Sequence, residues 1–358
     1  MLKSKEKQAP RQGVSRRKFM EFAVSGMAAA GPTILGATDK AGRRRPIVGS
    51  GEHTYEVIHD WGRLPKHLRY GNTHGVRISA SGFVHVHHTV HATSESSDSM
   101  VVFDADGKFV KSWGAEFRGG AHGLHISREG SEEFLYFCDI QRNIVVKTTL
   151  EGKPVFTLGY PDQSDAYKPG ADGARPKYTP TNLAIGPNGD IYVGDGYGSS
   201  YVIQYNKHGE YIRTFGGPGE GPGRLQVPHG IMVDPRGAEP LLIVADRSNH
   251  RLQYFTLEGR HLRFEHGVNL PCHFDTFGGE LLVPDLAARV TIMDKNNQVI
   301  VHLGEGSDDW AKRREMSREN FLPGKFVCPH GACYDAAGNI FVVEWVEIGR
   351  VTKLRKVA

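Results

Sequence analysis

The stretch PHGIMVDPRGAEPLLIVADRSNHRLQYF, residues 228–255, contains the pattern that decides the fold. It begins with a short His-Gly phrase, PHGIMVD (228–234), and passes through a turn into a β-rich run, LLIVADRSNHRLQYF (241–255). Before it lies EYIRTFG (210–216), which ends in an aromatic residue and a glycine. Alternating apolar residues bounded by Gly, Asn and Asp turns indicate β-strands. The stretch therefore predicts several short strands in succession.

Both short phrases recur six times along the chain. Successive His-Gly phrases begin about 44 to 60 residues apart, a period that is typical of four-stranded propeller blades. The phrases of the EYIRTFG kind lie at 55–62, 108–114, 153–159, 210–216, 260–267 and 298–304. Those of the His-Gly kind lie at 73–79, 121–127, 180–186, 228–234, 272–278 and 329–335.

The sixfold repeat predicts an all-β fold, a six-bladed β-propeller over residues 46–358 that resembles the NHL-repeat type. The last blade lacks an outer strand, and we expect the N-terminal strand near residues 55–61 to supply it. Such closure removes exposed sheet edges. Helix is expected only in the loop at 308–319. A tandem of β-sandwiches is the alternative fold, but it does not explain the sixfold repetition.

The N-terminal segment indicates export. The sequence SRRKFM (15–20) matches the twin-arginine pattern, and a weakly apolar stretch, residues 22–37, follows it. That stretch has the length of a signal-peptide core and is short for a membrane span. We therefore predict that residues 1–41 are a twin-arginine signal peptide with a basic tail. The export machinery would carry the folded protein to the periplasm or beyond it, with no membrane span after signal removal. An amphipathic N-terminal helix is the alternative.

The charge is unevenly distributed. Residues 1–45 contain eleven Lys and Arg against three Asp and Glu, so the remainder of a chain with net charge +4 has a net charge of about −4. A nucleic-acid surface needs a basic stripe, and we expect no nucleic-acid partner. The four cysteines, Cys138, Cys272, Cys328 and Cys333, lack metal-site spacing. One or two disulfides or free buried thiols are equally compatible with an exported protein.

The His-Gly phrases place a histidine at the same register position in five of the six blades. In this class of propeller the phrase forms the innermost strand and lines the channel. Three neutral imidazoles from alternate blades would converge on one axis and suit catalytic zinc, although iron, copper and nickel also accept imidazole. The alternative is a turn device that hydrogen-bonds between blades. The predicted ligands are His122, His229 and His330; His74, Asn182 and His273 complete the register as possible additional channel residues.

A further histidine-rich motif, HVHHTVH (85–91), lies in the first blade. Strand alternation would place His85 and His87 on one face and His88 on the other. A second metal site or a polar channel mouth would both fit this pattern.

The third and fourth blades contain more specific residues. IYVGDGYGSSYVIQY (191–205) and the stretch from 227 to 255 resemble peptidyl-α-hydroxyglycine α-amidating lyase, a zinc propeller that acts in peptide C-terminal amidation. The resemblance covers most of residues 70–355. It implies a lyase that cleaves the C–N bond of a carbinolamide to give an amide and glyoxylate, and so a small-molecule or peptide-like substrate.

By this resemblance His122, His229 and His330 match the family's zinc ligands. Tyr197 matches its catalytic tyrosine, the general base, and Arg247 matches the arginine that holds the substrate or steadies the charge of the tyrosine. A phenol can act as a base when a nearby cation depresses its pKa, which is normally about 10.

Three positions depart from the family. His88 or Thr89 stands where the family has a second active-site arginine, and Gly198 stands where it has a disulfide cysteine. Gly331 replaces the aspartate of the family's structural calcium site, so we expect no calcium here. These departures leave room for a related small carbinolamide as substrate or for changed chemistry.

Two other functions compete with a lyase. A non-catalytic propeller would bind a protein or glycan through the loops 160–180 and 305–325 at the channel mouth. A propeller lactonase or related hydrolase would need carboxylates and an asparagine around calcium, for which Glu344, Asn182 and Asp195 are the candidates. The lactonase reading leaves the ring of histidines unexplained.

Overall fold

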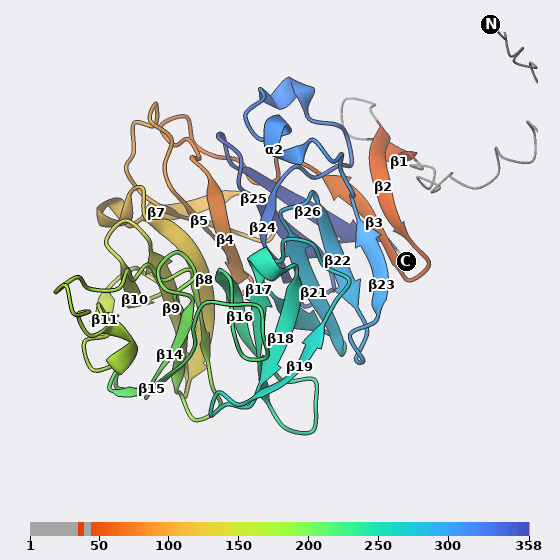
Figure 1. The fold of residues 1–358 in the computed structure, drawn as a ribbon. Coiled ribbons are helices and arrows are strands. Elements are labelled where there is room, and N and C mark those ends of the chain that lie inside the picture. The colour runs from red at the N-terminus through yellow and green to blue at the C-terminus, as the bar shows by residue number, and fades with distance from the viewer. Residues whose placement is uncertain (1–34, 39–43, 358) are drawn as a thin grey trace, which may run out of the picture. The chain divides into compact units, whose positions relative to one another are not determined.

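Six antiparallel sheets, five with four strands and one with six, make up the protein in a computed structural model that describes residues 35–38 and 44–357 (Figure 1). This confirms the six-bladed β-propeller predicted from the sequence repeat. The residues that match the twin-arginine pattern lie outside the described part of the chain. Within the described residues no helix has the length and apolar character needed to cross a bilayer.

Each blade begins with an inner strand and continues outward in chain order. Blade one contains β4 (Thr73–Ile78), β5 (Val84–His88), β6 (Met100–Phe103) and β7 (Phe109–Trp113). Blade two contains β8 (Ala121–Glu129), β9 (Glu132–Asp139), β10 (Ile144–Thr149) and β11 (Pro154–Leu158). Blade three contains β12 (Asn182–Ile185), β13 (Ile191–Gly194), β14 (Tyr201–Tyr205) and β15 (Tyr211–Gly216).

The later blades follow the same plan. Blade four contains β16 (Pro228–Asp234), β17 (Leu241–Asp246), β18 (Arg251–Phe255) and β19 (His261–Glu265). Blade five contains β20 (Asp275–Phe277), β21 (Glu280–Asp285), β22 (Arg289–Met293) and β23 (Val299–Leu303). Blade six contains β24 (Pro329–Tyr334), β25 (Ile340–Glu344) and β26 (Arg350–Lys356).

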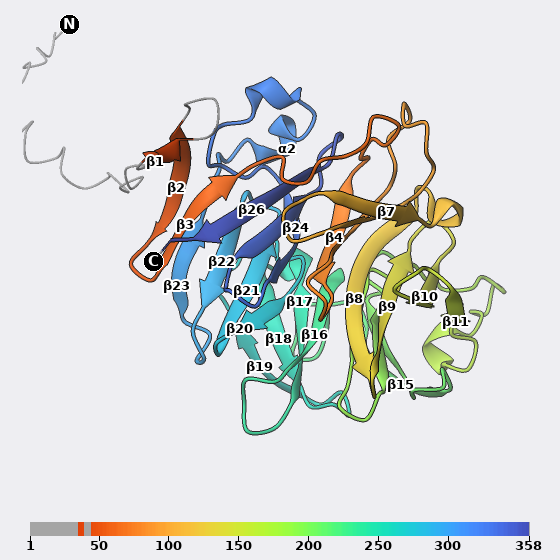
Figure 2. The same ribbon diagram turned by 180° about the vertical axis from the view of Figure 1, so that it is seen from behind.

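The N-terminal strand closes the last blade, as predicted. Strand β3 (His53–Ile58) pairs antiparallel with β26, with Lys353 opposite Ile58 and Lys356 opposite Tyr55. Figure 2 shows β3 beside β26, although the two strands lie at opposite ends of the sequence. Two more strands, β1 (Leu35–Thr38) and β2 (Arg44–Ser50), extend the sheet beyond β3. The backbone of β1 lies within the range that was assigned to the signal peptide and basic tail.

The apolar core lies between neighbouring blades. At the junction of blades six and one, Val86, Phe103, Phe341 and Val343 are fully buried together. Trp61 packs edge-on against Phe103 and Phe341, with ring centroids 5.6 and 4.7 Å apart. Because each sheet presents apolar side chains to both neighbours, its strands are hydrophobic on both faces. Blade packing therefore fixes the orientation of each inner strand toward the channel.

The close contact between adjacent inner strands explains why glycine recurs in the His-Gly phrase. A Cβ on Gly123 would lie 2.6 Å from the Thr181 carbonyl oxygen, and one on Gly230 would lie 2.6 Å from that of Cys272. Only glycine allows this approach. The strand pairing also shifts register at the histidine that precedes Gly123 or Gly230, as in a β-bulge. A bulge re-aims the side chain at that position, here toward the channel.

An acidic side chain stands at the end of the second strand, or directly after it, in blades two to six. In blades three to six it accepts hydrogen bonds from the backbone of the loop that precedes the inner strand. Asp246 accepts hydrogen bonds from the Gln226 backbone N–H at 2.7 Å and from the Arg251 side chain at 2.7 Å. Glu344 accepts from the Val327 backbone N–H and from Arg350. The five residues are Asp139, Asp195, Asp246, Asp285 and Glu344, and His88 occupies the corresponding place in blade one.

Two further predictions concern the helix content and the cysteines. Helix α2 (Trp310–Arg313) lies inside the loop where helix was expected. All four cysteines are free and buried, so the structure has no disulfide among them.

Candidate functional site

The three predicted ligands bring their rings together at the channel axis. The ring centroids of His122, His229 and His330 are 4.7, 4.7 and 4.8 Å apart, which is a nearly equilateral triangle. All three side chains are almost completely buried. The three rings are therefore neighbours in the fold.

One nitrogen of each ring is held by the next blade. The Nδ1 of His122 lies 2.5 Å from the Thr181 carbonyl oxygen, and that of His229 lies 2.9 Å from the Cys272 carbonyl oxygen. The Nδ1 of His330 lies 2.9 Å from the carbonyl oxygen of His74. Since a carbonyl can only accept, each Nδ1 carries the proton and each Nε2 keeps its lone pair. The hydrogen bond to the next blade thus orients each ring and leaves its Nε2 lone pair available.

Tyr197 contacts two of the three imidazoles. Its hydroxyl lies 3.2 Å from Nε2 of His122, 3.1 Å from Nε2 of His229 and 3.2 Å from a terminal nitrogen of Arg247. The Arg247 guanidinium also lies 5.3 Å from the centre of the tyrosine ring. The two residues that the resemblance named as catalytic therefore contact each other and the imidazoles.

His74 is a fourth member of the cluster, whereas the other register positions are engaged elsewhere. The side-chain nitrogens of His74, His122 and His330 lie within 4.8 Å of one another, the only such trio of possible metal ligands among the described residues. His74 Nδ1 lies 3.3 Å from Nε2 of His330. By contrast, Nε2 of His273 accepts from Arg77 at 3.1 Å, and the Asn182 amide oxygen accepts from the Leu183 backbone N–H.

The donor set fits a cation. The Nε2 lone pairs of His122, His229 and His330 are not committed to backbone carbonyls, and the protein offers them only the Tyr197 hydroxyl hydrogen and the Nδ1 hydrogen of His74. One lone pair is therefore left without a donor in a buried site. Burial also lowers the pKa of His122 and His229 well below the ordinary value, and that of His330 to about 3. Neutral imidazoles at neutral pH are the form that binds transition metals.

The pKa of Tyr197 moves in a direction that the sequence did not suggest. Burial raises this pKa above its ordinary value, and the Arg247 guanidinium opposes the shift without cancelling it. The expected lowering of the pKa is therefore absent. Removal of the phenolate from water destabilises it by more than the neighbouring guanidinium stabilises it.

Asp195 holds the loop that carries Tyr197. Its carboxylate accepts from the Thr179 backbone N–H at 2.7 Å, the Ser199 backbone N–H at 2.6 Å and the Tyr167 hydroxyl at 2.6 Å. A Cβ on Gly198 would lie 2.0 Å from an Asp195 carboxylate oxygen, so glycine is required there. The sequence DGYG thus forms a hydrogen-bonded turn that fixes the position of the tyrosine.

A cavity of about 730 Å³ opens beside Tyr197. Its walls come from blades two to four and include Asn143, Thr179 and Val227. A small polar molecule could therefore reach the tyrosine hydroxyl from this side.

The histidine-rich motif of blade one does not form a second metal site among the described residues. His85, His87 and His88 all lie in β5 and are buried. Both ring nitrogens of His85 and of His87 lack a hydrogen-bond partner. His88 Nδ1 accepts from the Val90 backbone N–H at 3.0 Å, and its ring packs edge-on against Tyr70. These rings act as core side chains.

Comparison with known proteins agrees with this arrangement at the level of the fold. No family model matches the chain. Peptidyl-alpha-hydroxyglycine alpha-amidating lyase 1 of Drosophila melanogaster is 33% identical over 170 residues, which cover 44% of this chain and 29% of that protein. NHL repeat-containing protein 3 of Homo sapiens is 27% identical over 201 residues, covering 53% of this chain and 54% of that protein. The chain thus spans less than two thirds of these relatives.

Solved structures complete the comparison. A gluconolactonase from Xanthomonas campestris superimposes with a TM-score of 0.59 at 14% identity, covering 92% of this chain and 99% of the other. A streptogramin B lyase gives a TM-score of 0.56 at 14% identity, covering 86% and 99%. The chain is an NHL-repeat-like six-bladed propeller. Likeness at this identity extends to the fold alone.

Sequence reasoning missed one charged residue near the imidazoles of this propeller. Arg314 follows α2, and its guanidinium donates to the side-chain oxygen of Asn72 at 3.2 Å. Asn72 lies two residues before His74 in the chain. No local motif marks Arg314, because it reaches the cluster only through the fold of the loop between β23 and β24.

Proposed function

We propose that this propeller is a metal-dependent lyase that cleaves the C–N bond of a carbinolamide and releases an amide and glyoxylate. The observation that carries the proposal is the placement of one tyrosine hydroxyl between two imidazole Nε2 atoms and a guanidinium. The partial likeness to the amidating lyase of Drosophila melanogaster supports the substrate class.

His122, His229 and His330 would hold the metal, with zinc as the first candidate. Their Nδ1 hydrogens are committed to backbone carbonyls, which leaves three Nε2 lone pairs for an ion. His74 has no such carbonyl partner and stands beside the set. A bound divalent cation would acidify the substrate hydroxyl as a Lewis acid.

Tyr197 would act as the general base. The substrate O–H gives its proton to the phenolate oxygen of Tyr197, the carbon forms a C=O bond, and the electron pair of the C–N bond passes to nitrogen. Tyr197 then returns the proton to the leaving nitrogen, so that no net proton is consumed. Because burial raises the pKa of this phenol, its charged form depends on Arg247 beside it.

The two carboxylates that a lactonase would need for calcium are engaged in other contacts. Asp195 is saturated by backbone N–H groups and Tyr167, while Glu344 is paired with Arg350 and two backbone N–H groups. Neither is free to bind calcium and activate water. We therefore do not propose hydrolysis at these residues.

The direct test is turnover of N-acetyl-α-hydroxyglycine by tag-free, zinc-loaded protein. The expected result is acetamide and glyoxylate in equal amounts, loss of turnover after chelation, and its return when zinc is added back. The His122→Ala/His229→Ala protein should be inactive under all three conditions. Glyoxylate release no faster than the spontaneous rate would contradict the lyase and favour the non-catalytic propeller, which binds a protein or glycan.

A further inference from the structure

Arg314 lies at the junction of blades six and one, on the His74 side of the imidazole cluster. Its Nε donates to the Trp345 carbonyl oxygen at 3.0 Å, and one terminal nitrogen donates to Asn72 at 3.2 Å. The guanidinium carbon lies 3.5 Å from the centre of the Trp345 ring. Stacking on an aromatic face fixes the plane of the guanidinium and leaves its N–H edge free.

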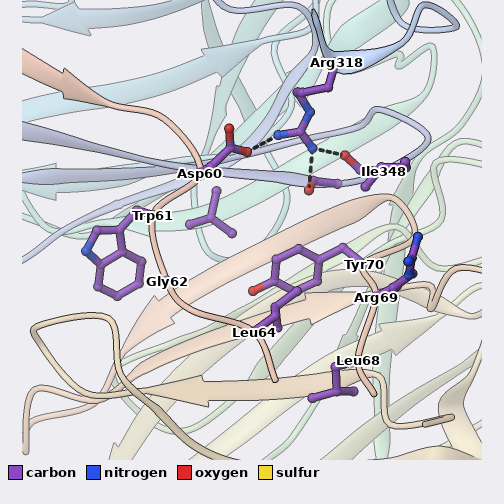
Figure 3. A pocket seen from close by; sticks show the side chains of 11 residues that line it. Asp60, Trp61, Gly62, Leu64, Leu68, Arg69, Tyr70, Arg318 and Ile348 are labelled. Carbon is purple, nitrogen blue, oxygen red and sulfur yellow. Dashed lines mark hydrogen bonds and ion pairs between the residues drawn. The ribbon is translucent and has the colours of Figure 1, made fainter. Parts of the chain in front are cut away.

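The loop that carries Arg314 is firmly anchored. Arg313 binds Ser307 at 2.6 Å and Asp309 at 2.7 Å, which closes the turn of α2. Arg318 pairs with Asp60 and donates to the carbonyl oxygens of Ile348 and Gly349 (Figure 3). These contacts fasten the loop to blade six and to the segment between β3 and β4, so Arg314 is held at a fixed place in the fold.

Arg314 has no carboxylate partner among the described residues, although buried arginines elsewhere in the blades do. Arg251 pairs with Asp246 at 2.7 Å, and Arg350 pairs with Glu344. Asn72 and the Trp345 carbonyl are neutral acceptors, which leave the positive charge uncompensated. Of its five N–H donors, three have no acceptor in the described structure. A partly buried cation with a free donor edge is suited to bind an anion.

Arg314 lies on the His74 side of the imidazole cluster, because its hydrogen-bond partner Asn72 is two residues before His74 in the chain. Arg247, the other guanidinium without a carboxylate partner at the cluster, is committed to the Tyr197 hydroxyl. Arg247 therefore interacts with the tyrosine, whereas Arg314 remains available to bind an anion.

We propose that Arg314, fixed by Trp345 and Asn72, is a carboxylate-binding subsite that selects substrates with an anionic group next to the reacting carbon. This inference rests on the proposed function for the identity of the reacting carbon. It assigns the substrate carboxylate to the loop between blades five and six.

The test uses a stable probe rather than turnover. N-acetylglycine retains the amide and carboxylate but lacks the hydroxyl group, and N-acetylglycinamide is its neutral counterpart. Binding to the zinc-loaded protein is measured by calorimetry and by Trp345 fluorescence. We expect Arg314→Gln to weaken N-acetylglycine binding about tenfold or more, as expected for loss of a charge-assisted hydrogen bond. Binding of N-acetylglycinamide should be the same in both proteins, and Arg314→Lys should recover part of the loss.

Lys312→Gln is the matched control, because it removes the same charge from an exposed position two residues away in the same loop. Its affinity for N-acetylglycine should match that of the wild-type protein. Equal affinity of wild type and Arg314→Gln for N-acetylglycine, or no binding of N-acetylglycine to the wild type, would overturn the subsite. Selective loss of anion binding in Arg314→Gln together with no glyoxylate release would leave the subsite standing and remove only the lyase.

Discussion

At the scale of single residues, the site depends on side chains that share hydrogen-bond partners. Nε2 of His122 and Nε2 of His229 both approach one phenolic hydrogen, while Nδ1 of each ring is fixed by a carbonyl of the next blade. This arrangement sets the tautomer and the direction of each ring before any ligand arrives. The imidazoles are therefore pre-organised, and Tyr197 is the group whose proton can move.

Tyr197→Phe tests that division of roles. The change removes one hydroxyl and preserves the ring, so the zinc content of the protein should remain at the wild-type level. Turnover should fall by about 10²- to 10⁴-fold, because the general base is lost. Zinc analysis and glyoxylate release on the same sample make the measurement. A variant within a few-fold of wild-type turnover would remove Tyr197 from the mechanism.

Buried histidines outside the ligand set predict a pH dependence of stability. Burial lowers the pKa of His85 to about 4 and that of His88 to about 3, whereas each would titrate near 6.5 when unfolded. Between those values the unfolded chain binds more protons than the folded one. Stability is therefore complete above pH 6.5 and falls as the pH is lowered, by up to about 1.4 kcal/mol per pH unit for each histidine.

Chemical unfolding of the metal-stripped protein at several pH values from 7.5 to 5 measures this effect. The free energy of unfolding should decline progressively below pH 6.5. A constant value down to pH 5 would show that these imidazoles are not held neutral by the fold.

At the scale of strands and loops, sequence repeats predicted the architecture better than they predicted the chemistry. The recurring phrases located the inner and outer strands and the closure by β3, because β-strand alternation and blade spacing are local signals. The alternate-blade register brought His122, His229 and His330 together. It did not separate His74 from His273, since the ring orientation depends on partners such as Arg77 that are distant in sequence.

Arg314 and the hydrogen bonds of Asp195 illustrate why other parts of the candidate site could not be predicted from the sequence. The three partners of Asp195 come from segments 4 to 28 residues away, and Asn72 lies 242 residues from Arg314. No single stretch of sequence contains such an arrangement.

Gly123→Ala tests the close contact between inner strands. The added methyl group would lie 2.6 Å from the Thr181 carbonyl oxygen, which also orients His122. We expect a loss of about 1–3 kcal/mol in the free energy of unfolding, as for other overpacked sites, and weaker zinc binding. Gly159→Ala is the control, because a Cβ there has no heavy atom within 4 Å and should change stability by less than about 0.5 kcal/mol. Equal stability of the two variants would contradict this account of the His-Gly phrase.

Asp195→Asn tests the support of the catalytic loop. Replacing one carboxylate oxygen by an amide places a donor against backbone N–H groups, which should cost about 1–3 kcal/mol. Asp285→Asn makes the same change in blade five, where Asp285 accepts from the Asn269 and Leu270 backbone N–H groups. Unfolding and turnover are measured for both. Both variants should lose stability, but only Asp195→Asn should lose turnover disproportionately; equal turnover would assign Asp195 a purely structural role.

At the scale of the whole molecule, ring closure holds the channel together. Blade six takes its outer strand from the N-terminal side and its other strands from the C-terminal side, so the first and last blades cannot separate without breaking a sheet. The triangle of imidazole rings formed by His122, His229 and His330 spans blades two, four and six, and its geometry therefore depends on this closure.

Two truncations separate closure from the additional strands. A chain that begins at residue 51 lacks β1 and β2 but keeps β3, and it should fold with a cooperative unfolding transition. A chain that begins at residue 59 exposes the edge of β26 and should aggregate or unfold at a markedly lower temperature. Size-exclusion chromatography and circular dichroism give the answer. A monomeric, cooperatively folded chain beginning at residue 59 would show that β3 is dispensable.

The most direct test of the metal centre is a crystal structure of tag-free protein with anomalous scattering recorded above and below the zinc edge. We predict one strong peak on the channel axis, within bonding distance of Nε2 of His122, His229 and His330 and beside the Tyr197 hydroxyl. A channel without an anomalous peak in crystals grown with excess zinc, or a peak away from these imidazoles, would contradict the account.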